Sequence, residues 1–414
     1  MRKMGPESKE FQPGVQAIDL VARTPLEAKS VQVSGKTLSV PDLVRTTKVQ
    51  PRPYQERIVA KTLDLFCNQG VRSILIDSPT GSGKTIMGLL IARAMHEQLG
   101  LNVGWVAMRR HLLTQSAREN EAKEINVPCA WISMFDRNPP TGLDLLVVDE
   151  AQHDAAGSMA HLHNIVKPRF ILGLSATPFR SDRMKLCFDT VIKDAGIHRL
   201  IQDGYLSRFH HFTIQEYTPA SVAKAYCREP TRWGKTLMSF HTLKECRACQ
   251  KLLTAQGIRA EVVSGQSDRE TQIAAFHAGE LDVLVNCLML GEGFDCPDLK
   301  TVFCRPGCKP VTIQTCGRVL RNQPDLPFKQ IVQCRDTPWP FTRTAGAVLQ
   351  YVWMDEEWRT LQLNPRINDI SWKVLKAMSH VQIELPKFLL KKRARPRWHD
   401  LRSSPSHVDG TVNL

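Results

Sequence analysis

The chain has 414 residues, of which 42% are hydrophobic and 23% charged, proportions typical of a globular protein. Its apolar runs are short, which excludes a membrane-spanning helix of about 20 residues, and residues 1–14 lack the apolar core of a secretory signal. The formal net charge of +14 favours a polyanionic partner, most simply nucleic acid, over a merely basic protein. Twelve cysteines without a secretion signal predict a reduced, cytoplasmic compartment.

Residues 1–48 are polar and weakly periodic, and they predict an N-terminal arm or small cap. Over residues 49–205, short apolar runs alternate with helical stretches. This alternation predicts an α/β domain with a parallel sheet covered on both faces. Its expected strands are 73–76, 103–108, 143–148 and 170–174.

A second alternating series over residues 231–338 predicts a second α/β domain, joined to the first by a linker at 206–230. Its expected strands are 236–240, 260–263, 282–286, 301–304 and 330–334, and its expected helices are 243–256, 268–278 and 311–321. The C-terminal extension, 339–414, holds five of the eight tryptophans, and its stretch 387–397 has six basic residues and no acidic one. Such an extension can stack bases and hold phosphates, or its tryptophans can pack against the second domain.

Residues 78–85 read SPTGSGKT, between an expected strand and the helical stretch 86–99. A glycine turn that opens a helix is a phosphate cradle, because backbone N–H groups and the positive helix end meet there. Lys84 is placed to reach the β- and γ-phosphates, and the Thr85 hydroxyl to hold Mg²⁺. Ser78 replaces the usual first glycine with a small residue. The segment predicts an ATP site formed by Thr80, Gly81, Ser82, Gly83, Lys84 and Thr85.

The segment 145–153 reads LLVVDEAQH, a buried strand that ends in two carboxylates. Beyond a phosphate-binding loop, such a pair predicts the second half of the same site. Asp149 is expected to hold Mg²⁺ and Glu150 to polarise the attacking water.

With these motifs the chain resembles the superfamily 2 helicases of the DEAD/DEAH type over about residues 50–335. The other segments that carry the resemblance occur in the family's order: RPYQ (52–55), AMRRHLLTQ (107–115), LSATPFR (174–180), LMSFHT (237–242), LVNCLMLGEGFD (284–295) and QTCGRVLR (314–321). The resemblance is closest to the restriction-subunit and repair branch of phage or bacterial type. It implies two tandem RecA-like domains.

The resemblance also implies roles for individual residues. Gln55 would contact the adenine, while Gly293 and Asp295 would sense the nucleotide and ribose. Gln314, Arg318 and Arg321 would complete the catalytic site from the second domain and stabilise charge on the γ-phosphoryl group. The i, i+3 spacing of the two arginines predicts that they share one helix face.

The acidic motif ends in Gln152, where relatives more often have Asp or His, so this is a DEAQ variant in which Gln152 would couple to Ser175 and Thr177. Gly291 stands where many relatives carry threonine. The resemblance further implies that one nucleic-acid strand is held through phosphate contacts without sequence readout. The residues expected to make these contacts are Arg109, Arg110, Thr114, Gln115, Ser133, His241 and Thr242.

The resulting expectation is an ATP- and Mg²⁺-dependent helicase or translocase. It would act on DNA rather than RNA in replication, recombination or repair, together with proteins of those processes. The source would be a bacterium or a phage-infected cell. One alternative is an ATP-gated clamp that remodels nucleic acid without separating strands, and another is the motor subunit of a nuclease complex. Cys246 and Cys249 have the spacing of a zinc half-site, but within an amphipathic helix they fit buried core positions better.

Overall fold

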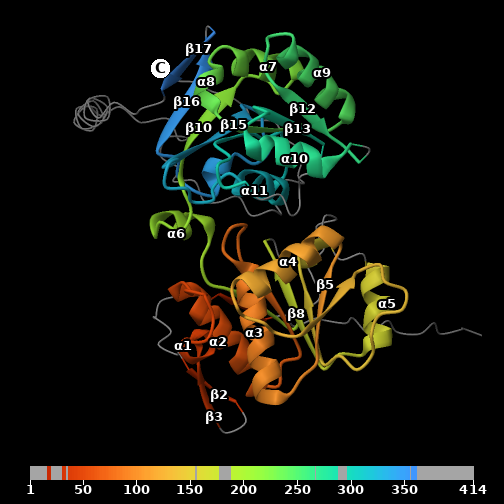
Figure 1. The fold of residues 1–414 in the computed structure, drawn as a ribbon. Coiled ribbons are helices and arrows are strands. Elements are labelled where there is room, and N and C mark those ends of the chain that lie inside the picture. Colours follow the sequence, from red (N-terminus) through yellow and green to blue (C-terminus); the bar gives the residue numbers. More distant parts are fainter. Residues whose placement is uncertain are drawn as a thin grey trace, which may run out of the picture. The chain divides into compact units, whose positions relative to one another are not determined.

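The protein forms two α/β lobes, each built on a largely parallel sheet (Figure 1). The structure is a computed structural model that describes residues 16–19, 30–33, 36–153, 156–176, 188–265, 267–287, 296–354 and 356–360. The described residues belong to one compact unit. The predicted fold class of two tandem RecA-like parallel-sheet domains is confirmed.

The N-terminal lobe contains a seven-stranded parallel sheet with the order β1-β9-β4-β8-β7-β5-β6. Its strands are β1 (Gln16–Asp19), β4 (Ser73–Asp77), β5 (Val103–Ala107), β6 (Cys129–Ser133), β7 (Leu145–Val148), β8 (Phe170–Ser175) and β9 (Thr190–Lys193). Its helices are α1 (Val40–Val44), α2 (Pro53–Cys67), α3 (Lys84–Leu99), α4 (Arg110–Ala122), α5 (Ala156–Val166) and α6 (Ile197–Gln202). A 3₁₀ turn covers Ala151–His153, and β2 (Ser30–Val33) and β3 (Lys36–Ser39) form a separate antiparallel pair.

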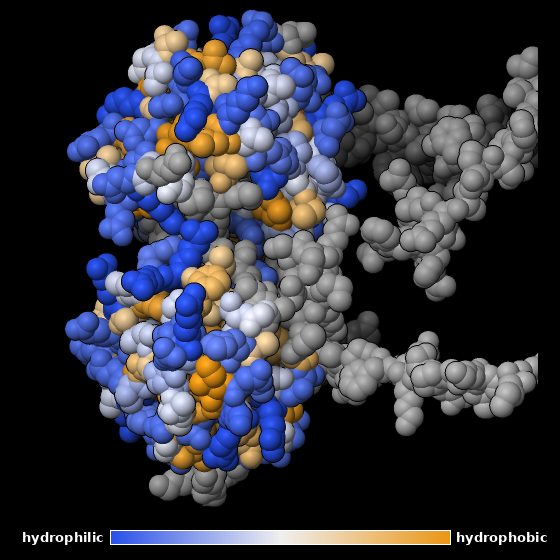
Figure 2. Space-filling view, turned by 90° about the vertical axis from the view of Figure 1, so that its right-hand side faces the viewer, coloured by the Kyte–Doolittle hydropathy of each residue, from blue (hydrophilic) through white to orange (hydrophobic). Residues whose placement is uncertain are grey.

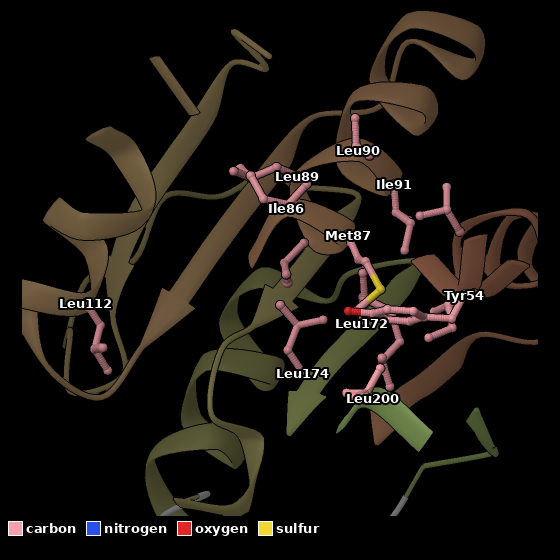
Figure 3. Close-up of a cluster of buried hydrophobic side chains, with 14 of the residues drawn as sticks. Tyr54, Ile86, Met87, Leu89, Leu90, Ile91, Leu112, Leu172, Leu174 and Leu200 are labelled. Carbon is pink, nitrogen blue, oxygen red and sulfur yellow. The ribbon is translucent and has the colours of Figure 1, made fainter. Parts of the chain in front are cut away.

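Both faces of this sheet are buried, as the apolar character of its strands predicts. Ile74 and Ile76 of β4 point into a core shared with α2, α3 and α4, whereas Leu75 between them points into the core under α5. Figure 3 shows part of the first core, where Leu172 and Leu174 of β8 lie among side chains of α3. The loops at the carboxyl ends of these strands are thereby held on a rigid layer.

The C-terminal lobe contains an eight-stranded sheet with the order β12-β13-β11-β14-β15-β10-β16-β17, in which only the pairing of β16 with β17 is antiparallel. The strands are β10 (Arg208–Ile214), β11 (Thr236–Ser239), β12 (Ala260–Val263), β13 (Val283–Asn286), β14 (Thr301–Phe303), β15 (Phe328–Cys334), β16 (Leu349–Met354) and β17 (Glu357–Thr360). The helices are α7 (Pro219–Cys227), α8 (Pro230–Trp233), α9 (Leu243–Thr254), α10 (Arg269–Ala278) and α11 (Lys309–Gly317), with a 3₁₀ turn at Phe341–Arg343.

The segment 206–230 is not a linker, which corrects the expectation from the sequence. Its residues 208–214 form β10 between β15 and β16, and α7 packs on the same lobe. The reason is that Phe209 and Phe212 are buried, and His211 shares a hydrogen bond of 3.1 Å with Gln333 on the neighbouring strand. The connection between the lobes is therefore confined to the few residues around Gly204–Ser207.

Part of the expected C-terminal extension also belongs to the second sheet, since β16 and β17 lie within it. Trp353 and Trp358 meet edge-on with ring centroids 5.0 Å apart, and Trp358 also contacts Trp233 and Phe212. These tryptophans pack against the second lobe, which was one of the two alternatives. The basic stretch 387–397 lies outside the described residues.

The surface in Figure 2 shows hydrophilic residues interspersed with smaller hydrophobic areas. In the part of the chain that the structure describes, no helix has the length and apolarity needed to cross a membrane. Cys246 and Cys249 are fully buried in α9, and burial raises the pKa of each thiol to about 12. They are core residues, as expected.

Candidate nucleotide site and nucleic-acid interface

The loop SPTGSGKT lies between β4 and α3 with two glycines in the left-handed region. Gly81 has φ of 81° and Gly83, the N-cap of α3, has φ of 78°, conformations that cost other residues about 1–2 kcal/mol. Ser78 is buried and its hydroxyl donates to the Ser82 hydroxyl at 2.8 Å. Its backbone N–H donates to the carbonyl of Ser175 at 2.9 Å. The serine therefore fits where the usual first glycine is missing and ties the loop to β8.

The RPYQ segment supports this loop. The Tyr54 hydroxyl donates to the Ser82 carbonyl at 2.6 Å, and Nε2 of Gln55 donates to the same oxygen at 2.8 Å. Oε1 of Gln55 accepts from the Arg52 backbone N–H at 2.8 Å, at the start of α2. A Cβ atom on Gly83 would lie 2.4 Å from Gln55 Nε2. The glutamine amide thus braces the phosphate-binding loop, and its contact with adenine stays a prediction.

The acidic pair follows β7, as predicted. Asp149 is 6% exposed, and its backbone N–H donates to the Val106 carbonyl at 2.9 Å. Glu150 has φ of 50°, an uncommon value for a residue with a Cβ. Burial and the neighbouring Glu150 raise the pKa of Asp149, while Lys84 opposes that rise. A buried carboxylate of this kind is stabilised by a cation beside it.

Gln152 connects Glu150 to β8. Its Nε2 donates to Glu150 Oε2 at 2.5 Å, and its Oε1 accepts from the Ser175 hydroxyl at 2.5 Å. Because an amide both donates and accepts, it can join a carboxylate to a hydroxyl. The expected link to Ser175 is therefore present in the geometry, whereas Thr177 lies outside the described residues.

A cavity of about 340 Å³ opens over the loop and draws its lining from both lobes. The described residues that line it are Arg52, Thr80, Gly81, Gly83, Lys84, Thr85, Leu112, Gln115, Ser116, Glu119, Asp149, Glu150, Tyr205, Pro297, Arg318, Arg321 and Asn322. It therefore brings together nine of the residues expected at the nucleotide site: Thr80, Gly81, Gly83, Lys84, Thr85, Asp149, Glu150, Arg318 and Arg321. Among the residues that the structure describes, the lining does not include Gln55, Ser82 or Gln314. The structure does not describe Gly293 and Asp295.

The two arginines reach the cavity by a different route from the one expected. The helix predicted over 311–321 ends at Gly317, so Arg318 is its C-cap and Arg321 lies beyond it. The chain leaves the helix because the Ser207 backbone N–H donates to the Leu320 carbonyl at 2.8 Å, and Leu206 pairs with Arg321 in an isolated antiparallel bridge. A turn, rather than one helix face, brings the two side chains to the same cavity.

Two further lining residues were missed by the sequence analysis. The guanidinium carbon of Arg52 lies 4.9 Å from the centre of the Tyr205 ring, and the Tyr54 and Tyr205 ring centroids are 5.6 Å apart. Arg52 opens the RPYQ segment, which the sequence analysis recognised without giving this arginine a role. Tyr205 lies in the connection between the lobes, where no pattern in the sequence distinguishes it.

The expected nucleic-acid contacts on the N-terminal lobe lie at the ends of β5 and β6 and on α4. Arg109 is the N-cap of α4, and Arg110, its first residue, is exposed. Thr114 is exposed, and its hydroxyl donates back to the Arg110 carbonyl at 3.2 Å. Gln115 lines the cavity instead. Ser133 ends β6, and its hydroxyl accepts from the Phe135 backbone N–H at 3.3 Å.

On the C-terminal lobe, His241 and Thr242 follow β11 and are exposed. The Thr242 hydroxyl caps α9, since it accepts from the Glu245 backbone N–H and donates to the Glu245 carboxylate. Nδ1 of His241 lies 2.8 Å from Nη1 of Arg305, and burial and Arg305 lower the pKa of His241. Arg305 follows β14. The sequence analysis missed this basic residue, which lies beside the expected contact His241.

Two family models match the chain. Residues 48–130 match the type III restriction enzyme res subunit, and residues 220–323 match the helicase conserved C-terminal domain. The first match covers the phosphate-binding loop and the second includes Arg318 and Arg321. The chain belongs to helicase superfamily 2.

Curated relatives of this superfamily 2 protein include Irc3 of Schizosaccharomyces pombe, which bears the name of a mitochondrial ATP-dependent helicase. It is 28% identical over 325 residues, which is 62% of the chain and 52% of the relative. A 51.5 kDa protein of a Lactococcus phage is 23% identical over 269 residues, 56% of the chain and 59% of the relative. The chain thus spans about half the length of the curated relatives it matches.

Among solved structures, a Saccharomyces cerevisiae Dbp5 variant bound to RNA and ADP BeF3 matches with a TM-score of 0.56 and 16% identity. The match covers 79% of the chain and 94% of Dbp5. The ATP-dependent type ISP restriction-modification enzyme LlaBIII, bound to DNA, matches with a TM-score of 0.52 and 15% identity, over 75% of the chain and 29% of LlaBIII. At these identities, the comparison shows that the fold is shared.

Proposed function

We propose that this superfamily 2 protein is an ATP-dependent helicase or translocase that acts on DNA. The observation that carries the proposal is the single cavity that holds a phosphate-binding loop, an acidic pair and two arginines from the other lobe. A site divided between two lobes lets ATP binding and hydrolysis change how the lobes meet, and each cycle can then alter the grip on a strand.

The residues have distinct tasks in this proposal. Lys84, buried at the start of α3, binds the terminal phosphates, and Glu150 orients the attacking water. Arg318 and Arg321 stabilise the charge that develops on the γ-phosphoryl group. The Thr85 hydroxyl and the Asp149 carboxylate are hard oxygen donors that suit Mg²⁺. The ion would supply charge neutralisation at a carboxylate whose burial is otherwise unfavourable.

Several features favour a nucleic-acid substrate, and DNA in particular. The net charge of +14 suits a polyanion. The family model over 48–130 is that of a restriction-enzyme subunit, and LlaBIII was solved with DNA, whereas Dbp5 was solved with RNA. A cytoplasmic role in phage or bacterial replication, recombination or repair is consistent with the phage relative.

The test is ATP turnover titrated with single-stranded DNA, forked DNA and RNA of matched length, run beside a strand-displacement assay. DNA-stimulated turnover with displacement of the forked strand is the expected result. Stimulation without displacement at any duplex length would instead favour an ATP-gated clamp or a translocating motor subunit. Stimulation by RNA alone would overturn the DNA assignment, and absence of any turnover would overturn the ATPase assignment.

A further inference from the structure

The nucleotide cavity has a guanidinium and an aromatic ring in its wall. Arg52 and Tyr205 both line it, and Tyr205 supplies the one aromatic ring among the described lining residues. Both side chains are partly buried. The guanidinium carbon of Arg52 lies 4.9 Å from the centre of the Tyr205 ring, a distance at which a guanidinium stacks on an aromatic face. The wall therefore contains a stacked pair of planar groups.

The Arg52 guanidinium is also fixed at its edge. Its Nη1 donates to the Tyr54 hydroxyl at 3.1 Å and lies 3.5 Å from the Gly81 carbonyl of the phosphate-binding loop. The Tyr54 ring in turn meets the Tyr205 ring at 63°, with centroids 5.6 Å apart. Within the described part of the chain, Arg52 forms no ion pair with a carboxylate. Its positive charge therefore remains for a ligand in the cavity.

Tyr205 belongs to the connection between the lobes. Its backbone N–H donates to the Leu200 carbonyl of α6 at 2.8 Å, and the N–H of the next residue, Leu206, donates to the same oxygen at 3.0 Å. Leu206 also pairs with Arg321 of the second lobe. The ring that supports Arg52 is therefore attached to the N-terminal lobe and adjoins a residue that is paired with the C-terminal lobe.

A surface for the base is what the phosphate-binding loop itself does not supply. The backbone N–H groups of such a loop and its lysine bind phosphates, and these are shared by every nucleoside triphosphate and by inorganic tripolyphosphate. A guanidinium stacks on a base as it does on a tyrosine ring. Arg52 also lies beside Gln55, the residue expected to contact adenine, since its backbone N–H donates to Gln55 Oε1 at 2.8 Å.

We propose that Tyr205 is a positioning residue that holds the Arg52 guanidinium flat, so that the opposite face of the guanidinium stacks on the base of ATP. Because Tyr205 lies in the connection, the fit of the base depends on where the connection places the ring, and a rotation of the lobes changes it. This inference rests on the proposed ATPase and deepens it, since it names the groups that bind the base.

The experiment compares the KM for ATP with the inhibition constant of magnesium tripolyphosphate, both measured from ADP formation in the presence of DNA. Tripolyphosphate offers three linked phosphates without a base. Tyr205 also packs against the core, and Tyr205→Leu keeps an apolar side chain there while it removes the flat ring. It should raise the KM for ATP about five-fold, the lower end of what stacking on a base contributes, and leave the inhibition constant unchanged. Tyr205→Phe is the matched control, because it keeps the ring and should behave as wild type.

Arg52→Lys is a second, independent variant, because it keeps the charge and removes the planar group. It should raise the KM for ATP to a similar extent without changing the inhibition constant, and Tyr205→Leu should add little in this background. An unchanged KM in either variant would overturn the inference. A parallel rise of the KM and the inhibition constant would also overturn it, as would a Tyr205→Phe protein that behaves like Tyr205→Leu. In each of these cases the wild type still hydrolyses ATP, whereas failure of the proposed function would appear as no ADP formation by the wild type.

Discussion

The bridge from Glu150 through Gln152 to Ser175 should be required for hydrolysis rather than for ATP binding. Gln152→Ala removes two hydrogen bonds of 2.5 Å each, one from Ser175 and one to the Glu150 carboxylate. A neutral hydrogen bond contributes about 1 kcal/mol and one to a charged group about 1.5–3 kcal/mol. Without these bonds Glu150 is less well oriented in the transition state. If this raises the activation free energy by about 2 kcal/mol, kcat falls about 30-fold.

The assay is phosphate release at saturating ATP and DNA, together with the KM for ATP. Ser175→Ala removes the neutral bond to Gln152 and leaves the one from Gln152 to Glu150 in place, so it should lower kcat about five-fold. It should add little in a Gln152→Ala background because the shared bond is already lost. Thermal unfolding controls for stability, since Gln152 is buried. A kcat within two-fold of wild type in a folded Gln152→Ala protein would refute this reasoning.

Three further changes test the rest of the site. Glu150→Gln should retain binding of a fluorescent ATP analogue and lower turnover about 10²-fold or more; retained turnover would mean that another residue orients the water. Arg318→Ala and Arg321→Ala should each lower kcat/KM for ATP about 10²-fold, and a wild-type value in either would remove that arginine from the site. Gly83→Ala should lower the free energy of unfolding in urea by about 2–4 kcal/mol, because φ is 78° and the new Cβ would lie 2.4 Å from Gln55 Nε2.

A matched control for the glycine change is Gly100→Ala. Gly100 caps the other end of α3 with φ of 66° and has no neighbouring atom within 4 Å of a new Cβ. Gly100→Ala therefore introduces backbone strain without a side-chain clash, at a cost of about 1–2 kcal/mol. Equal losses for the two variants would contradict the bracing role given to Gln55.

The central strands could be predicted from the sequence because both of their faces are buried. β4, β5 and β7 have almost continuous burial, which appears in the sequence as short apolar runs. The strands that were missed lie toward the edges or carry polar residues. β6 is mostly half-exposed at the edge of its sheet. β10 reads RFHHFTI, and its polar His211 fits a buried strand position because it shares a hydrogen bond with Gln333 of β15.

Local motifs likewise identified the loop and the acidic pair that line the cavity, but not the lining residues that come from elsewhere in the chain. The loop at 78–85 and the acidic pair are each contiguous, so their chemistry can be read directly. Tyr205 and Glu119 enter the cavity through tertiary contacts of a connection and a helix face, and nothing in their immediate sequence marks them. The helix end at Gly317 depends on hydrogen bonds to residues more than 100 positions away.

The connection between the lobes also suggests why two arginines are present. Leu206 contacts the phosphate-binding loop, since its Cδ2 lies 3.1 Å from the Cβ position of Gly81, and the same residue pairs with the backbone of Arg321. When two bodies rotate about a connection, atoms beside the pivot move least. Arg321 should therefore stay near the nucleotide throughout the cycle, so its loss should raise the KM for ATP as well as lower kcat. Arg318 is farther along the chain from these contacts and should contribute mainly when the lobes close, which a lowered kcat would report.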